Sequence, residues 1–313
     1  MKKLTIIPAD TTIDFMGRRK IAFVFSAMLV VAAAGLFLGL GLNLGIDFLG
    51  GILIEVKTEG PADVGRMRST LGQLGLGDVS LQEFGEPDVV LIRIQRQEGG
   101  DEAQQVAVTT VKEALGNTVV EYRRTETVGP TVGVELQEAA FLAVLAAIGA
   151  ILVYIWFRFE WQFGVAAVVA LLHDVISTIG LFSLLQLEFN LATVAAVLTI
   201  AGYSINDTVV VFDRVRENLR KYKKLPLPDL FDLSINGTLS RTIMTSLTTL
   251  LALASLYILG GEVIRGFSIA LIWGIVVGTY SSIALAVPLL LYLKIHRGAG
   301  EEQAEPAGVE VEG

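Results

Sequence analysis

The chain has 313 residues, 53% of them hydrophobic, and a formal net charge of −8. Its mean hydropathy of +0.62 is too high for an ordinary soluble domain, so the composition indicates a membrane protein. Because cysteine is absent, disulfides, thiolate metal sites and cysteine nucleophiles are excluded. Two histidines, His173 and His296, are too few for a histidine-built zinc site, so we expect no metal.

Six segments are apolar and long enough to cross about 30 Å of hydrocarbon as helices. A basic stretch at 1–20 precedes the first of them, whose apolar run is too long for a cleavable signal peptide. The predicted spans are 21–44, 139–157, 163–185, 191–212, 242–259 and 264–293.

Basic residues predict how these spans are oriented. The N-terminal stretch, Arg158, the loop 213–241 and the end of the last span lie on one side, which the positive-inside rule makes cytoplasmic. Both termini are then cytoplasmic. The tail 294–313 is acidic and lacks aromatic residues, so we expect it to be a disordered cytoplasmic extension.

The polar stretch 45–137 between the first two spans predicts a folded domain on the extracytoplasmic side. Mixed β-branched and polar residues indicate half-buried strands at 52–57, 79–84, 89–95 and 118–125. Helices are predicted at 61–76 and 101–115, the second ending at Gly116. The apolar face expected for this second helix consists of Val106, Val108, Val111 and Leu115.

The order βαββαβ is that of the ferredoxin-like fold. The expected fold class is therefore an α-helical membrane protein of six spans with an inserted ferredoxin-like α+β domain.

Two carboxylates lie inside predicted spans. Asp174 is near the middle of the third span, and Asp207 lies about 10 Å inside the cytoplasmic end of the fourth. An Asp near a span centre costs about 2.5–3.5 kcal/mol on insertion scales, so it should face the bundle interior or a water-filled path. Burial disfavours the charged form, and we therefore expect both residues to handle protons. The alternative is a structural hydrogen bond between helices.

Small polar residues accompany these carboxylates on the fourth and fifth spans. A hydroxyl-lined face can hold water and relay protons, whereas the alternative is back-bonding to helix carbonyls. Arg241 at the start of the fifth span either approaches Asp207 or anchors the helix at the membrane surface. The predicted supporting residues are Ser204, Asn206, Thr245 and Thr248.

His173 is adjacent to Asp174 in the sequence. Neighbouring residues on a helix point about 100° apart, so we expect the two not to pair. A hydrogen bond from His173 to another helix is the predicted arrangement, with a place in a proton path as the alternative.

A glycine-rich motif, "GIDFLGG", follows the first span. Its glycines Gly45, Gly50 and Gly51 permit turns and close backbone approach, and Asp47 could cap that turn. We interpret the motif as a structural hinge.

Several stretches resemble the SecD/SecF family of protein-export membrane proteins, and within it the SecF chains. They are "GIDFLGG", "AGYSINDTVVVFDRVREN" and "TLSRTIMTSLTTL", supported by "FRFEWQFGVAAVVALLHD" and "TVGP". The resemblance extends from residue 1 to about 297 and leaves out only the tail.

This resemblance implies one six-span half of an RND-superfamily architecture in a bacterial cytoplasmic (inner) membrane. The other half would be SecD, and the implied partners are the SecYEG channel, YajC, the translocating polypeptide and, indirectly, SecA. It implies use of the proton gradient in late steps of protein translocation. Asp207 matches the family's intramembrane carboxylate and Arg241 its membrane arginine.

Other classes of function fit the sequence less well. An intramembrane aspartyl protease would need Asp174 and Asp207 at one depth, sharing a proton, and their predicted depths differ. An RND-type exporter of small molecules or lipids, or a purely structural assembly subunit, stays an alternative. No Walker-type glycine loop is present, and topology explains the basic cluster at 214–224. We expect no enzymatic activity, cofactor or nucleic-acid partner.

Overall fold

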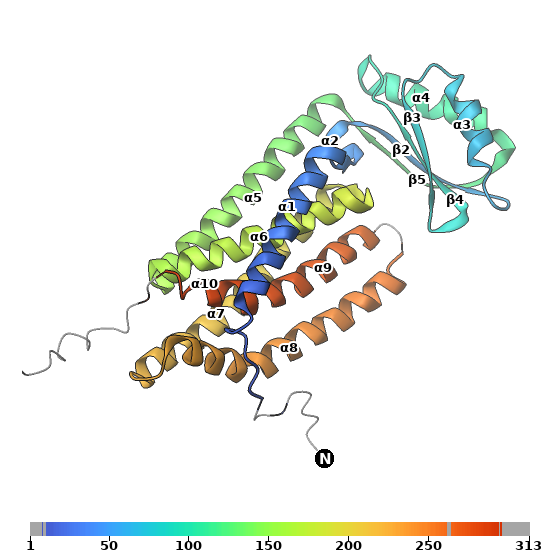
Figure 1. Cartoon of the computed structure of the whole chain (residues 1–313). Helices are drawn as coiled ribbons and strands as arrows, with labels where there is room; N and C mark the ends of the chain where they lie inside the picture. The colour runs from blue at the N-terminus through green and yellow to red at the C-terminus, as the bar shows by residue number, and fades with distance from the viewer. Residues whose placement is uncertain (1–7, 9–10, 262–263, 294, 296–313) are drawn as a thin grey trace, which may run out of the picture.

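The computed structural model describes residue 8 and residues 11–261, 264–293 and 295. Within these residues the chain forms a bundle of long helices with an α+β domain at one end (Figure 1). Residues 1–7, 9 and 10 of the basic N-terminal stretch lie outside the described residues, as do His296 and nearly all of the acidic tail. The disorder expected for the tail therefore stays a prediction.

Six helices of the described part are long and apolar enough to cross a membrane, as predicted. They are α1 (Arg19–Leu40), α5 (Pro130–Arg158), α6 (Trp161–Leu185), α7 (Leu191–Lys221), α8 (Leu227–Leu259) and α9 (Arg265–Ser281). The last continues through a π-helix, η3 (Ser282–Ala286), into α10 (Val287–Leu289).

Several helix ends differ from the predicted spans. Helix α5 begins at Pro130, after Gly129, because proline suits the first helical position. Most of the predicted loop 213–241 is helical, since α7 continues to Lys221 and α8 begins at Leu227. The residues of this segment include arginine, lysine, glutamate and leucine, which are good helix formers. Hydropathy indicates where a helix leaves the membrane and not where the helix itself ends, so the fourth and fifth predicted spans are shorter than α7 and α8. The membrane edges themselves stay a prediction.

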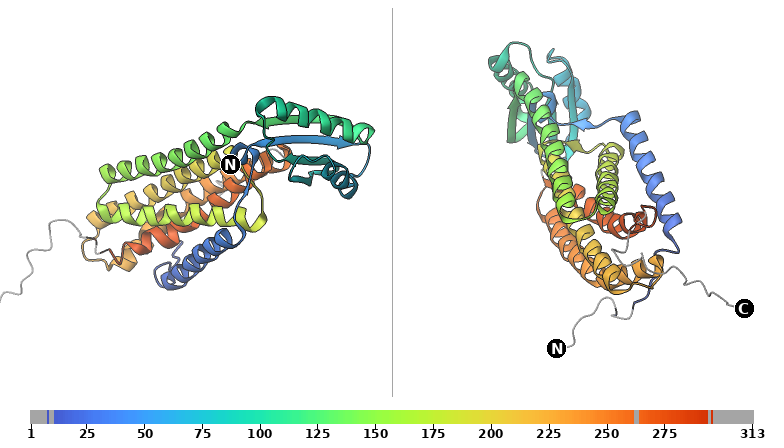
Figure 2. Two further views of the ribbon diagram at one scale, coloured as in Figure 1. Left: turned by 90° about the horizontal axis from the view of Figure 1, so that it is seen from above. Right: turned by 90° about the vertical axis from the view of Figure 1, so that its left-hand side faces the viewer.

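Helices α6, α7 and α9 form the middle of the bundle, while α1, α5 and α8 lie outside them (Figure 2). Phe159, Phe163 and Phe212 pack together where α5, α6 and α7 meet, with ring centroids 5.0–5.9 Å apart. Helix α1 approaches α6 closely at Gly180, where a Cβ would stand 2.3 Å from the Cβ of Ala33. Small residues thus allow the helices to pack at backbone distance.

The α+β domain consists of β2 (Gly51–Thr58), α3 (Val64–Gly72), β3 (Val79–Phe84), β4 (Glu86–Ile94), α4 (Gly100–Leu115) and β5 (Val119–Val128). Its antiparallel sheet has the order β3-β4-β2-β5, and α3 and α4 cover one face (Figure 1). The predicted βαββαβ order is confirmed. The apolar core lies between the sheet and the two helices.

The apolar face predicted for α4 is wrong at one position. Val108, Val111 and Leu115 are buried, but Val106 is 66% exposed. Residues two apart on a helix point about 200° from each other, so Val106 and Val108 cannot share a face. Ala107 completes the buried stripe instead. Gly116, in a positive-φ conformation, ends the helix as predicted.

A short junction joins the domain to the bundle. It comprises β1 (Asn43–Leu44), α2 (Ile46–Leu49) and β6 (Glu188–Phe189), which precedes α7. Strands β1 and β6 pair in parallel, so the chain leaving α1 is tied to the connection between α6 and α7. This pairing places the glycine motif directly beside the start of α7.

Candidate proton site in the membrane bundle

Asp207 projects from α7 into the bundle, and the residue is only 8% exposed. Thr242 on α8 donates to Asp207 Oδ1 at 2.8 Å, and Ser282 on η3 donates to Oδ2 at 2.7 Å. Each carboxylate oxygen therefore has a hydroxyl donor, as a buried polar group requires. Three helical elements build the site, and a change in the carboxyl's charge acts on all three.

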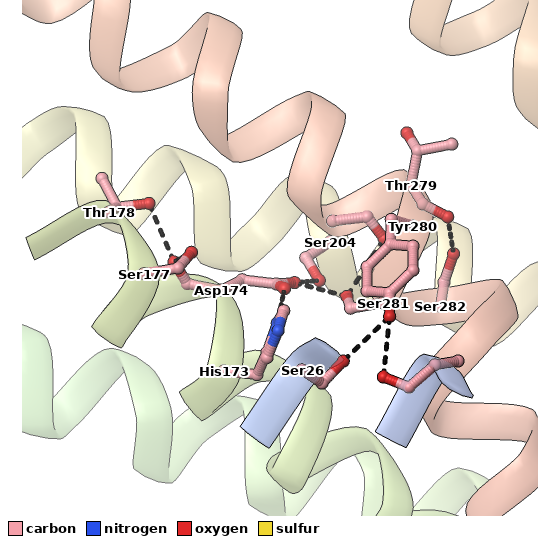
Figure 3. Close-up of polar contacts among 12 residues, drawn as sticks. Ser26, His173, Asp174, Ser177, Thr178, Ser204, Thr279, Tyr280, Ser281 and Ser282 are labelled. Carbon is pink, nitrogen blue, oxygen red and sulfur yellow. Dashed lines mark hydrogen bonds and ion pairs between the residues drawn. The ribbon is translucent and has the colours of Figure 1, made fainter. Parts of the chain in front are cut away.

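Asp174 on α6 forms a second buried carboxylate site and is fully enclosed (Figure 3). Ser204 on α7 and Ser281 on α9 donate to its Oδ2 at 2.6 and 2.8 Å. His173 Nδ1 lies 2.9 Å from its Oδ1. Asp174 is thus held from two neighbouring helices and from its own helix.

The expectation that His173 and Asp174 do not pair is wrong. Helical geometry separates their Cβ directions, but the imidazole is long enough for Nδ1 to reach the carboxylate at 2.9 Å. His173 is 4% exposed, and among the described residues its Nε2 has no hydrogen-bond partner. The pair is consequently buried, and its net charge changes when either member gains or loses a proton.

Two adjacent serines connect the carboxylate sites. Ser281 contacts Asp174 and Ser282 contacts Asp207. Within the described part of the chain, no hydrogen bond joins the two carboxyl groups directly. The arrangement therefore lacks the shared proton of an aspartyl protease dyad.

Sequence reasoning missed Thr242, Ser281 and Ser282. Thr242 is the residue directly after Arg241, and the serines belong to the run "TYSS" in the last span. Four polar residues in succession inside an apolar helix are the signal that could have indicated them.

Arg241 and part of the predicted polar path lie on the outside of this chain. Arg241, Asn206, Thr245 and Thr248 are all exposed. Thr245 and Thr248 donate to carbonyls of their own helix, which is the back-bonding alternative. Of the predicted supporting residues, Ser204 reaches a carboxylate, and that carboxylate is Asp174.

The predicted approach of Arg241 to Asp207 is met only in part. The positive charge of Arg241 acts electrostatically on the Asp207 carboxylate. Among the described residues, however, Arg241 forms no ion pair with Asp207. We name the exposed surface of Asn206, Arg241, Thr245 and Thr248 the polar face.

The glycine motif is built into the junction. Asp47 accepts a hydrogen bond from the Leu191 backbone N–H at 2.9 Å, so it caps α7 rather than its own turn. Gly50 and Gly51 have φ of +71° and +122°, a conformation that favours glycine. A Cβ on Gly45 would stand 2.6 Å from a carboxylate oxygen of Glu188. The hinge role of the motif stays a prediction.

An ion pair links the domain to this junction. Arg93 on β4 donates through Nη2 to Glu188 and through Nη1 to Asn43 Oδ1, the latter at 3.1 Å. The guanidinium thus holds both strands of the β1–β6 pair. In the described part of the chain, no cluster of three or more metal-ligating residues is present.

Comparison with protein families gives two matches. The model of "Protein export membrane protein SecD/SecF, C-terminal" matches residues 107–296, and that of the "SecD/SecF GG Motif" matches residues 35–62. The second match contains the glycine motif and the first contains both buried carboxylates.

Individual relatives agree over nearly the whole chain. The protein translocase subunit SecF of Cereibacter sphaeroides is 48% identical over 98% of this chain and 97% of its own. That of Rickettsia bellii is 46% identical over 92% of this chain and 95% of its own.

Solved structures of SecDF share the fold. The crystal structure of SecDF, a translocon-associated membrane protein from Thermus thermophilus, gives a TM-score of 0.85 at 39% identity over 92% of this chain. SecDF in the super-membrane-facing form gives 0.67 at 40% identity over 91%. The chain covers only 40% and 39% of those two chains. From the family model, the relatives and the shared fold together, the chain belongs to the SecD/SecF family of protein-export membrane proteins.

Proposed function

We propose that this chain is the SecF half of a complex that uses the proton gradient to promote late steps of protein translocation. The observation that carries the proposal is Asp207, a carboxylate 8% exposed within a helix bundle and held by donors from two other elements. Such a group is costly inside a membrane, which favours a role in proton transfer. Asp174, with His173, is the second proton site in this proposal.

The partner follows from the polar face. Asn206, Arg241, Thr245 and Thr248 are exposed on helices long enough to span a membrane. Hydrocarbon does not solvate a guanidinium or an amide, so a second set of helices has to cover this surface. The SecDF chains are more than twice as long as the part that this chain matches. We assign SecD to the polar face, where it would complete the surroundings of Arg241.

The remaining partners and the location in this proposal are those that the family resemblance implies. The complex lies in a bacterial cytoplasmic membrane with both termini of this chain in the cytoplasm and the α+β domain outside. It acts with the SecYEG channel and YajC on a translocating polypeptide that SecA has already moved into the channel. The basic residues between 214 and 224, at the end of α7 and just after it, support this orientation, as do those that precede α1.

The energy available from the proton gradient is sufficient to shift the equilibrium between two positions of a domain. One charge moving through 100 mV yields about 2.3 kcal/mol, which changes an equilibrium by a factor of tens. The two SecDF structures give different TM-scores at nearly equal identity, which supports more than one arrangement in this family. The α+β domain is the moving part in this proposal, with the glycine motif and Gly129 as its hinges.

The test is protein export in cells depleted of their own copy and complemented with Asp207→Asn. We expect export of a secreted reporter to slow as in depleted cells while the variant and SecD accumulate normally. Asp213→Asn is the matched control, because Asp213 lies on the same helix but is 41% exposed and paired with Arg158. Normal export and normal proton flux in Asp207→Asn would leave the carboxylate as a structural hydrogen-bond acceptor.

A purely structural subunit is the second candidate, and one observation favours it. All four oxygens of the two carboxylates have polar partners within 2.9 Å, as in a fixed interhelical network. In that case, Asp174→Asn and Asp207→Asn would lower the thermal stability of the purified chain without changing the dependence of export on the proton gradient.

A further inference from the structure

Ser282 lies between the Asp207 carboxylate and a carbonyl of its own helix. Its Oγ is 2.7 Å from Asp207 Oδ2 and 3.1 Å from the Thr279 carbonyl oxygen, and the residue is fully buried. A hydroxyl carries one hydrogen and can also accept. When Asp207 is charged, that hydrogen points to the carboxylate. When Asp207 is protonated, Ser282 can accept its proton and turn its own hydrogen to Thr279.

Thr242, the other partner of Asp207, has no such alternative. Its Oγ1 donates to Asp207 Oδ1 at 2.8 Å, and among the described residues this hydroxyl has no second acceptor. It therefore donates in both protonation states. The carboxyl proton of Asp207 is consequently placed on Oδ2, facing Ser282.

Ser281 repeats this arrangement at the other carboxylate. Its Oγ is 2.8 Å from Asp174 Oδ2 and 3.2 Å from the Gly278 carbonyl oxygen (Figure 3). Ser204, the second donor to that oxygen, has no other acceptor within the described part of the chain. Two adjacent serines thus each carry one rotatable hydroxyl group, and the two hydroxyl groups point to different carboxylates. The π-helix η3 starts at the second serine, and such wide turns are frequent at functional sites.

We propose that Ser281 and Ser282 are positioning residues for Asp174 and Asp207, respectively. Each serine accepts a hydrogen bond from its carboxyl group when that group is protonated, and donates a hydrogen bond to it when the proton has left. No covalent bond to serine forms or breaks. The proton binds the carboxylate, and the serine hydroxyl then donates to a carbonyl of its own helix instead of to the carboxylate. The two sites are coupled because the two serines are adjacent, Ser281 as the last residue of α9 and Ser282 as the first of η3. This inference rests on the proposed proton-coupled function and specifies how its site accommodates a proton.

Two other titratable or charged groups act on these carboxylates, and a third lies beside one of those groups. His173 on α6 contacts Asp174, and Arg241 on α8 acts electrostatically on Asp207. Tyr280 on α9 has its ring 6.2 Å from that of His173. A serine substitution removes none of these three groups, so a change in proton binding reports the lost hydroxyl.

The test uses the complete complex of this chain with SecD, reconstituted in vesicles. Proton flux is measured against pH, and infrared difference spectra record the C=O band of the protonated carboxyl, assigned by its loss in Asp207→Asn. Ser282→Ala removes a donor from the charged form and an acceptor from the neutral form. Hydrogen bonds to charged groups are the stronger, so the flux midpoint should move up by about one pH unit, and the Asp207 band should shift.

Matched variants separate this effect from a general loss of packing. Ser268→Ala is the control, because Ser268 is also fully buried on α9 and, among the described residues, donates only to the carbonyl of Ile264. It should leave the band and the midpoint unchanged. Ser281→Ala should shift the Asp174 band, and Ser282→Cys, with a weaker donor of similar size, should give an intermediate midpoint.

The outcomes distinguish the two proposals. If Asp207→Asn abolishes flux but Ser282→Ala keeps the wild-type band and midpoint, the serine inference is wrong and the proton site stands. If Asp207→Asn keeps full flux, the proposed function itself is wrong. Should Ser282→Ala fail to accumulate, an unshifted midpoint in Ser282→Cys would equally overturn the inference.

Discussion

The glycines of the junction provide a graded test of how the domain is attached. In Gly51→Ala, the new Cβ would stand 2.6 Å from the Ile94 carbonyl oxygen, at a residue with φ of +122°. Backbone strain and overpacking together predict a loss of about 3 kcal/mol or more. Gly50→Ala has only the strained backbone, with φ +71° and ψ 170° and no neighbour closer than 3.4 Å, so about 1–3 kcal/mol is expected.

The assay is backbone hydrogen exchange of β2 and β4 against temperature in the purified full-length chain. For a domain of this size, a loss of 3 kcal/mol corresponds to a fall of roughly 12 °C or more in melting temperature. Gly60→Ala is the control, because its Cβ would meet nothing within 4 Å and its φ is not in the left-handed range. Equal protection in Gly51→Ala and Gly60→Ala would refute the reasoning.

Three further changes probe the contacts around the bundle. Arg93→Ala breaks the ion pair with Glu188, in which the two side chains are only 17% and 23% exposed, and should cost about 1 kcal/mol of the free energy that holds the domain to the junction. The junction should then be cleaved faster by protease, and adding Glu188→Gln to this variant should change little. Gly180→Leu forces a side chain into α1 and should lower the melting temperature, whereas Gly149→Ala, with open space around it, should not. Gly278→Ala puts a methyl group 3.4 Å from the buried carboxylate on α6, and should shift that carboxyl's infrared band without removing any polar group.

The sequence was sufficient to locate the carboxylates but not their partners. The prediction that Asp174 and Asp207 lie inside the membrane requires only their position along an apolar span. Their donors Ser281 and Ser282 are 107 and 75 residues away along the chain. No local pattern specifies which helices meet, because the packing of α6, α7 and α9 depends on small residues spread over all of them.

Two other errors came from using only one property of a side chain, its direction in one case and its hydrophobicity in the other. The separation of His173 and Asp174 was inferred from Cβ geometry, whereas the ring nitrogen reaches the carboxylate. The reverse error placed Val106 on the apolar face of α4 because it is a valine, although its angular position faces solvent. The order of strands and helices along the domain and the number of long apolar helices were predictable, because alternation and hydropathy are properties of the segments themselves.

Helix α7 explains how the two ends of the molecule can communicate. Its first turn is held by Asp47 from the glycine motif and by the Asn190–Thr193 capping box. About 20 Å further along, at ~1.5 Å per residue, Ser204 contacts one carboxylate, and Asp207 follows one turn later. A single continuous helix therefore touches both buried carboxylate sites and the anchor of the α+β domain. Because an α-helix is stiff along its axis, a hydrogen-bond rearrangement at Asp207 that tilts or shifts α7 has to move its capped end against the junction.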